Sequence, residues 1–280
     1  MQGSAPRTIV VAHSPDSDDA FMFYALATQK VRSRQVRFEH ILADIESLNL
    51  AAQEGRYDMT AISYHAYPYV AGQYALTRSG SSVGDGYGPL VVAPRPLGPE
   101  ELKGKTIAVP GLRTTAYLAL KLFEPDFEPR VVPFDQILDA VEQGRVDAGL
   151  LIHEGQLNFD RWGVHRIIDL GRWWKQAYGL PLPLGANALR RSLEPEIQAE
   201  CGRLLRQSIE YALAHREEAL SYAMQFARGL DPRLADRFVG MYVNEHTLGA
   251  DPQVAQAAQM LLDLGHQAGL IPHRVTIEFV

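Results

Sequence analysis

Short apolar runs alternate with amphipathic stretches over the first two thirds of the chain. Apolar runs that predict buried strands cover residues 8–12, 36–40, 58–63, 91–93, 105–109, 130–133, 147–152 and 167–170. Helical periodicity covers residues 20–29, 45–54, 116–123 and 134–143. Strands that alternate with helices indicate an α/β fold in which most strands are parallel.

The last third is helix-rich, with helices predicted over residues 197–214, 216–228 and 252–268. Clusters of proline and glycine near Pro94 and near Pro183 interrupt the pattern. Two such interruptions are consistent with two crossings of the chain between lobes. We therefore predict one lobe from residues 1–92 plus 188–280, a second lobe from residues 93–187, and a ligand cleft between them.

Composition narrows the class of partner. The 280 residues are 46% hydrophobic, which is enough for one large domain or two ordinary ones, each with a real core. The net charge of -6, without a cluster of Lys and Arg, argues against a nucleic-acid partner. The sequence makes no prediction of oligomeric state. We expect a small-molecule ligand.

No cofactor or metal is expected. One cysteine, Cys201, cannot form an intrachain disulfide, and Cys-x-x-Cys and His-Glu-x-x-His patterns are absent. The glycine-rich segment 84–89 lacks the Gly-x-Gly-x-x-Gly spacing of a dinucleotide site, and there is no P-loop. The start of the chain does not read as a secretory signal, and no apolar run is long enough to cross a bilayer, so we expect no membrane contact and a cytoplasmic location.

One histidine falls where chemistry is expected. His153 follows the predicted strand 147–152, and ligands of open α/β sheets bind outside the carboxyl ends of strands. An imidazole has an ordinary pKa of about 6.5 and can accept a proton near neutral pH. A histidine that is simply hydrogen-bonded at the rim of the core is the alternative. Glu154 and Gly88 are further candidates to line the cleft.

Three loops after predicted strands supply hydrogen-bonding groups. The first, residues 13–19, contains Ser14 and Asp19, the second begins at Ser63, and the third contains Thr114 and Thr115 at the start of a helix. Hydroxyl groups beside a helix N-terminus suit a carboxylate or phosphate. Helix caps and strand-end contacts to the backbone are the alternative for each. Because no Gly-x-Ser-x-Gly elbow is present, a base acting on a small bound molecule is a better fit than a serine hydrolase.

Several segments together resemble the 1,4-dihydroxy-6-naphthoate synthase family of the futalosine route to menaquinone. The similar segments are residues 14–26, 44–49, 63–67, 86–92, 114–117, 149–154, 179–185, 211–215 and 242–244. The first of these begins Ser14-Pro15-Asp16-Ser17-Asp18-Asp19, where the family often has Ser-Pro-Cys-Pro-Asn-Asp. This chain keeps the last acidic position and departs at the Cys and Asn positions.

The resemblance implies a two-lobed periplasmic-binding-protein-like (type II) fold and an enzyme. The family converts cyclic dehypoxanthine futalosine to 1,4-dihydroxy-6-naphthoate, so the implied chemistry is of the lyase type, started by a general base. The resemblance assigns the proton acceptor to His153. It places substrate contacts at Ala61, Ile62, Ser63, Thr114 and Thr115.

Two other functions stay open at this point. A sister family with the same fold dehydrates chorismate, but its opening loop has a Tyr-Leu-Asn segment that this chain lacks. A small-molecule binding protein without catalysis is the other reading, and such a protein has no use for a base at His153.

Overall fold

The computed structural model describes residues 5–226, 231–249 and 251–280. Its strands form two separate sheets. The strands of the first sheet, in spatial order, are β2 (Val36–Leu42), β1 (Arg7–His13), β3 (Met59–Ser63), β11 (Leu182–Arg190) and β4 (Tyr74–Leu76), and β5 (Ser82–Gly84) also pairs with β11. β1 is parallel to β2 and β3, because intervening helices carry the chain back across the sheet.

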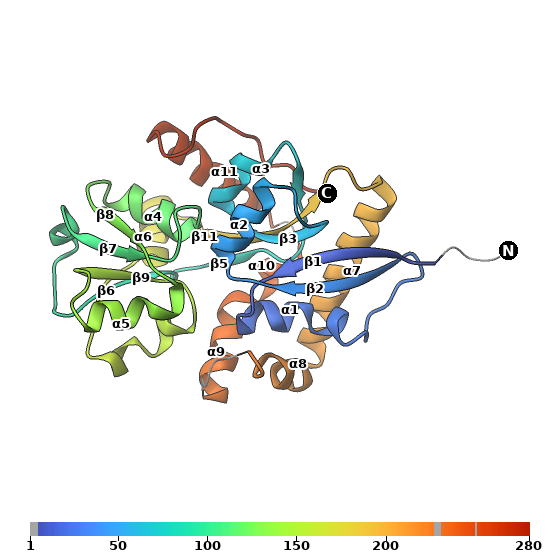
Figure 1. Cartoon of the computed structure of the whole chain (residues 1–280), viewed down its shortest axis with the longest axis horizontal. Coiled ribbons are helices and arrows are strands. Elements are labelled where there is room, and N and C mark those ends of the chain that lie inside the picture. The colour runs from blue at the N-terminus through green and yellow to red at the C-terminus, as the bar shows by residue number, and fades with distance from the viewer. Residues whose placement is uncertain (1–4, 227–230, 250) are drawn as a thin grey trace.

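Helices cover both faces of this sheet to form the first lobe. Figure 1 shows α2, α3 and α11 above the sheet, and α1, α8 and α9 below it. The helices of this lobe are α1 (Ser17–Ala27), α2 (Ile45–Gln53), α3 (Tyr67–Val70), α7 (Pro195–Ala214), α8 (Arg216–Ala223), α9 (Pro232–Tyr242), α10 (Glu245–Leu248) and α11 (Pro252–Gln267). The short 3-10 turn η1 (Tyr64–Ala66) follows β3 directly.

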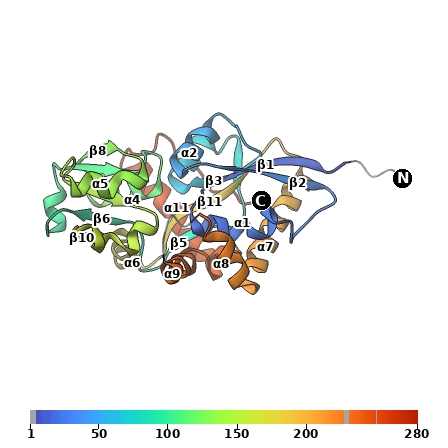
Figure 2. The same ribbon diagram turned by 60° about the horizontal axis from the view of Figure 1, so that its bottom comes forward.

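The second sheet and its helices form the second lobe, which stands to one side of the first in Figures 1 and 2. Its strands are, in spatial order, β10 (His165–Asp169), β6 (Leu90–Ala93), β9 (Ala148–Leu151), β7 (Thr106–Val109) and β8 (Glu128–Val131). Its helices are α4 (Thr115–Phe123), α5 (Ile137–Glu142) and α6 (Leu170–Tyr178), with 3-10 turns η2 (Pro99–Leu102), η3 (Phe134–Gln136), η4 (Glu154–Leu157) and η5 (Phe159–Trp162).

Both sheets are mixed, which corrects the prediction that most strands are parallel. β11 runs antiparallel to β3, β4 and β5, and β6 runs antiparallel to β9 and β10. The sequence pattern does not predict β11, because Pro183 and Gly185 are typical chain breakers. Both residues lie in the strand, at a shift of its register against β5. Proline is tolerated at such irregularities, where no ladder hydrogen bond is required of it.

Element boundaries also differ from prediction elsewhere, and α6 and α9 were not predicted. α1 begins at Ser17, so Asp18 and Asp19 lie in its first turn and not in the preceding loop. The predicted helix 216–228 ends as α8 at Ala223, and residues 227 and 228 lie outside those described. β6 already belongs to the second sheet and β11 to the first, so the chain crosses between sheets somewhat before the predicted boundaries at 93 and 188.

The apolar core is continuous between the lobes. One cluster of buried side chains includes Ile62 and Leu76 of the first sheet, Val91 and Ile107 of the second, and Leu118 of α4. A separate cluster packs α1, α7 and α8 under the first sheet, and another packs α5 on the second. Among the described helices, none is both long and apolar enough to span a membrane.

Candidate active site

A cavity of about 120 Å³ lies between the lobes. The ends of β1 and β3, the start of β11 and the N-terminus of α4 surround it. Its walls are formed by Ser14, Asp16, Asp18, Asp19, Met22, Ile45, Ala61, Ile62, Ser63, Gly80, Ser82, Pro89, Thr114, Thr115, Ala116, Ile152, Leu184, Gly185, Ala186, Asn187, Phe238 and Tyr242. The structure thus brings together all five residues assigned to substrate contacts by the resemblance, along with Ser14 and Asp19.

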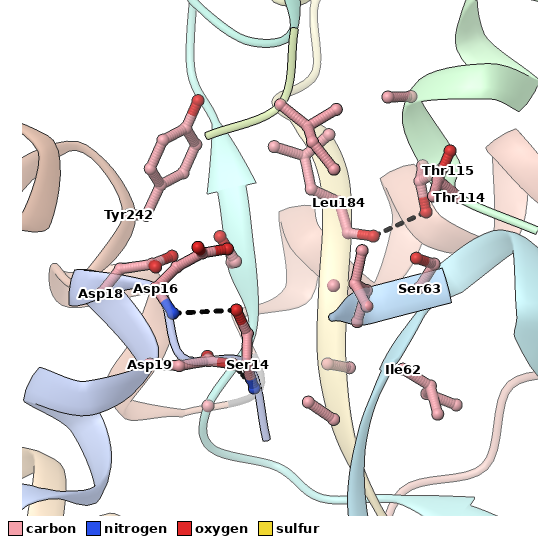
Figure 3. Close-up of a pocket in the computed structure, with 18 of the residues that line it drawn as sticks. Ser14, Asp16, Asp18, Asp19, Ile62, Ser63, Thr114, Thr115, Leu184 and Tyr242 are labelled. Carbon is pink, nitrogen blue, oxygen red and sulfur yellow. Dashed lines mark hydrogen bonds between the residues drawn. The ribbon is translucent and has the colours of Figure 1, made fainter. Parts of the chain in front are cut away.

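One wall is acidic and comes from the start of α1. Asp16, Asp18 and Asp19 lie on this side in Figure 3, with Tyr242 next to them. The turn before the helix is fixed by Ser14, whose backbone N–H donates to Asp19 Oδ2 at 2.8 Å and whose Oγ accepts from the Asp16 N–H at 3.0 Å. Capping by this loop was one predicted role, but the side chain of the N-cap residue Asp16 makes no cap hydrogen bond.

Burial raises the pKa of both carboxyls in the first turn of α1. The pKa of Asp19 rises to about 7, although the hydrogen bond from the Ser14 N–H opposes the rise. The pKa of Asp18 also lies well above its ordinary value, because of burial and then the nearby charges of Asp19, Asp16 and Glu154. This wall can therefore hold a proton near neutral pH and can donate a hydrogen bond to a ligand.

The opposite wall carries hydroxyl groups at the N-terminus of α4 (Figure 3). Thr114 is the N-cap residue, and its Oγ1 accepts from the Tyr117 N–H at 3.2 Å, as the capping alternative predicted. Thr115 Oγ1 donates to the Leu184 carbonyl at 2.6 Å and accepts from the His65 N–H at 3.2 Å. Capping does not exclude a ligand contact, because both threonines also line the cavity.

Ser63 reaches the cavity from the end of β3 and is held by Asn49 of α2. The Ser63 N–H donates to Asn49 Oδ1 at 2.8 Å, and Ser63 Oγ accepts from Asn49 Nδ2 at 3.0 Å. The hydroxyl hydrogen of Ser63 can then be directed toward a ligand. Asn49 is 0% exposed. Its role was missed, and its only sequence signal was its place in the similar segment 44–49, because local patterns do not show that α2 packs beside the end of β3.

His65 supports the threonine wall from behind and was also missed. Its Nδ1 lies 3.2 Å from the Thr114 carbonyl oxygen, so the neutral ring carries its proton on Nδ1 and donates to that carbonyl. Burial lowers the pKa of His65 to about 4 and keeps the ring neutral. The only sequence signal for this residue was its place in the segment after Ser63.

His153 lies beside the cavity and is not part of its wall. Its neighbour Ile152 lines the cavity, whereas the His153 ring packs edge-on against Phe134. Nδ1 accepts from the Gly155 N–H at 2.9 Å, so Nε2 carries the proton and donates to the Phe134 carbonyl at 2.8 Å. Both ring nitrogens are therefore occupied within the second lobe in this conformation.

The remaining two cleft candidates lie outside the wall of this cavity. Glu154 is 5% exposed, and its Oε1 accepts from the Ser17 N–H at 3.2 Å and from Ser17 Oγ at 2.9 Å. Gly88 packs against the backbone of Gly171, where a Cβ atom would lie 2.9 Å from the Gly171 nitrogen. Close backbone packing accounts for the glycine at this position.

Distant parts of the chain complete the cavity. Tyr242 and Phe238 come from α9 and Asn187 from β11, and Asn187 Oδ1 is buried without a hydrogen-bond partner among the described residues. The only signal for Tyr242 was the similarity of residues 242–244 to the family, and none pointed to Asn187. Within the described residues, no group of three or more His, Cys, Asp or Glu side chains is arranged to hold a metal ion.

Comparison with known proteins gives a consistent result over nearly the whole chain. The family described as menaquinone biosynthesis matches residues 9–267. A curated relative from Thermus thermophilus, named 1,4-dihydroxy-6-naphthoate synthase, is 43% identical over 257 residues, which are 92% of this chain and 93% of that protein. A crystal structure of a protein from Archaeoglobus fulgidus is 48% identical, with a TM-score of 0.91 over 94% of this chain and 98% of that one.

More distant solved structures show the fold alone. The alkanesulfonate-binding protein of Xanthomonas axonopodis pv. citri, bound to MOPS, is 18% identical, with a TM-score of 0.73 over 98% of this chain and 97% of that one. It belongs with other neighbours of the periplasmic-binding-protein type. The predicted two-lobed fold of that type is thereby confirmed.

Proposed function

Because this chain belongs to the menaquinone-biosynthesis family, we propose that it is a 1,4-dihydroxy-6-naphthoate synthase that acts on cyclic dehypoxanthine futalosine. The observation that carries this proposal is the 43% identity to a synthase of that name over 92% of the chain. The cavity supports it, since the residues that the family resemblance assigns to substrate contacts all line this one cavity between the lobes.

The polarity of the cavity suggests how the substrate lies. A carboxylate, which the naphthoate product retains, suits the Ser63 hydroxyl and the positive end of α4. Thr114 and Thr115 line this end of the cavity, and their hydroxyls donate to the carbonyls of Gly111 and Leu184. In its ionised form the acidic wall of Asp16, Asp18 and Asp19 would repel a carboxylate, and it suits hydroxyl donors. We propose that the carboxylate faces α4 and that hydroxyl groups of the substrate face α1.

We propose His153 as the proton acceptor of the reaction. Its position supports this role, because it follows a residue of the cavity wall at the end of β9. The Gly155 N–H occupies the Nδ1 lone pair, so the ring must turn away from this contact before it takes a proton. Rotation about its side-chain bonds toward Ile152 would bring the imidazole to the substrate.

The proposed chemistry is of the lyase type. His153 removes a proton from a substrate carbon, and the electron pair of that bond drives cleavage of a carbon–carbon or carbon–oxygen bond. The cleavage leaves the aromatic ring of the product, and no electrons are exchanged with another molecule. A protonated Asp18 or Asp19 can stabilise negative charge that develops on the leaving fragment. We also propose that the enzyme acts in the cytoplasm.

Incubation of the purified protein with cyclic dehypoxanthine futalosine tests the function, with the naphthoate product detected by absorbance and mass. We expect turnover by the wild type and a fall of about 10²–10⁴ in rate for His153→Ala, as for loss of a positioned base. Circular dichroism and thermal melting check that the variant is folded. Tight binding without product would contradict catalysis, and neither binding nor product would make chorismate the next ligand to test.

If the wild type forms product and folded His153→Ala keeps its rate, the proposed reaction stands and the role of His153 as proton acceptor is contradicted. The acidic wall would then supply the proton acceptor, and Asp18→Asn and Asp19→Asn would be compared in the same assay. His273→Ala is the matched control, because its ring bonds to the Pro68 carbonyl away from the cavity. It should keep the wild-type rate.

A further inference from the structure

Two glutamates cross between the lobes in opposite directions. Glu154 of the second lobe reaches the first turn of α1 in the first lobe, where its Oε1 accepts from both the N–H and the hydroxyl of Ser17, at 3.2 and 2.9 Å. Glu154 and Ser17 are 5% and 0% exposed. A carboxylate at a helix N-terminus binds backbone N–H groups that the helix leaves free and is favoured by the helix dipole.

Glu46 makes the reverse contact from α2 in the first lobe. Both of its carboxylate oxygens lie 3.1 Å from the Arg113 nitrogen, in the loop that precedes α4 of the second lobe. The loop passes so close that a Cβ atom on Gly111 would lie 2.2 Å from the Glu46 carboxyl carbon. A glycine at this position is therefore required for Glu46 to reach the Arg113 N–H.

Each crossing contact is adjacent in sequence to residues of the proposed reaction. Glu154 directly follows His153, and the partner of Glu46, Arg113, directly precedes Thr114 and Thr115. η4 has a second contact to the first lobe, because Tyr242 Oη donates to Gln156 Oε1 at 2.8 Å. The contacts of Glu154 and Glu46 therefore influence where the segment that carries His153 and the threonine wall lie relative to Ser63 and α1.

We propose that Glu46 and Glu154 are a reciprocal pair of interlobe clamps that hold the cleft closed and act as positioning residues for the reaction. The part that concerns the reaction rests on the proposed function. The part that concerns closure does not, since it rests on the hydrogen bonds that Glu154 and Glu46 make across the lobes. The apolar cluster shared by the lobes and the hydrogen bonds of Thr115 to Leu184 and His65 keep the lobes joined, and the clamps determine how far they close over the cavity.

Each clamp depends first on a side-chain oxygen that accepts hydrogen bonds, and the negative charge adds a smaller contribution. Glutamine in place of either glutamate keeps a side-chain oxygen that can accept from the same N–H groups, whereas alanine removes it. Loss of a hydrogen bond to a charged group lowers a rate that depends on closure by about 10- to 100-fold. We therefore expect kcat/KM to fall by that amount in Glu46→Ala and Glu154→Ala and to recover in large part in Glu46→Gln and Glu154→Gln.

The distance between the lobes tests closure without any substrate. Spin labels at Glu39→Cys in the first lobe and Glu142→Cys in the second report this distance by pulsed electron resonance, since both positions are exposed. Cys201 is 0% exposed, and burial raises its thiol pKa to about 12, so it stays unlabelled. We expect a longer and broader distance distribution in both alanine variants and the wild-type distribution in both glutamine variants.

Glu128→Ala is the matched control, because it removes an exposed carboxylate from β8 of the second lobe. It should change neither the distance nor the rate. An unchanged distance distribution in both folded alanine variants overturns the clamps, whatever the assay shows. Should an alanine variant fail to fold, a wild-type distance and a lost rate in its glutamine counterpart contradict the proposal equally. If the wild type shows the closed distance but forms no product, the proposed function is contradicted and the clamp proposal stands.

Discussion

Asn49 shows how much one buried amide determines at this site. It has no exposed surface, and it uses its carbonyl and its amino group to hold the backbone and the hydroxyl of Ser63. A serine at a strand end is otherwise free to bond to nearby backbone. With Asn49 in place, the Ser63 hydroxyl has one orientation, and its hydrogen is left for a ligand.

Thr114 combines a structural and a binding role, and the two can be separated by measurement. We expect Thr114→Ala to cost about 1 kcal/mol of stability through loss of the α4 cap. We also expect it to raise KM more than it lowers kcat, because the hydroxyl orients the bound substrate. Thr114→Ser keeps the hydroxyl and should restore both quantities. Steady-state kinetics and urea unfolding test this. An unchanged KM in Thr114→Ala would contradict the binding role and leave Thr114 with the structural role of capping α4.

At the scale of elements, close packing of α6 against the segment before β6 depends on glycine. A Cβ atom on Gly171 would lie 1.8 Å from the Tyr87 carbonyl oxygen, and that atom cannot move without its backbone. α6 and β6 therefore meet closely only because this position carries no side chain. The same contact explains Gly88, which faces Gly171.

Gly171→Ala should destabilise the protein by about 3 kcal/mol through this overlap. Gly202→Ala in α7 is the matched control, because its Cβ would meet no atom within 4 Å. That change should stabilise the protein by about 0.5–1 kcal/mol, since alanine is the better helix former. Urea unfolding of the two variants distinguishes them, and equal stabilities would contradict the packing argument.

At the scale of the whole molecule, two adjacent histidines of the first sheet are neutral, the buried His13 of β1 and the half-buried His40 of β2. Burial lowers the pKa of His13 to about 3 and that of His40 to about 4. His13 stacks on Phe23, and its Nδ1 donates to the Ser14 carbonyl at 3.0 Å. Its Nε2 therefore accepts from His40 Nδ1 at 3.1 Å, which requires a neutral His13 ring. Such residues couple the stability of the fold to pH.

Between pH 6.5 and about 3 the unfolded chain binds a proton at His13 that the folded chain does not, so stability falls as the pH falls. Each such histidine contributes a slope of up to about 1.4 kcal/mol per pH unit. Asp19, whose pKa rises to about 7, contributes with the opposite sign between pH 7 and 3.8.

We expect His13→Gln to lose less unfolding free energy than the wild type between pH 6 and pH 4.5, as measured by urea unfolding. Equal losses of unfolding free energy in the variant and the wild type would show that His13 does not cause the loss of stability in acid.

The sequence alone determined what depends on neighbours along the chain. Apolar runs located the five strands of the second sheet and β1, β2 and β3 of the first, but not β4, β5 or β11. Thr114 was placed at a helix start because a cap acts within one turn. The similarity of segments in order along the chain also indicated the family, because such segments carry cavity residues that local patterns cannot distinguish from caps.

Only the tertiary structure decided which polar groups meet. Glu154 and Ser17 are 137 residues apart, and Ser63 takes its orientation from a helix whose position the strand pattern does not specify. The direction of β11 was settled by pairing with β3, which overrides the weak strand propensity of Pro183 and Gly185. Hydrogen bonds across the cleft depend on how two lobes pack, and packing is set by the whole buried surface rather than by any local segment.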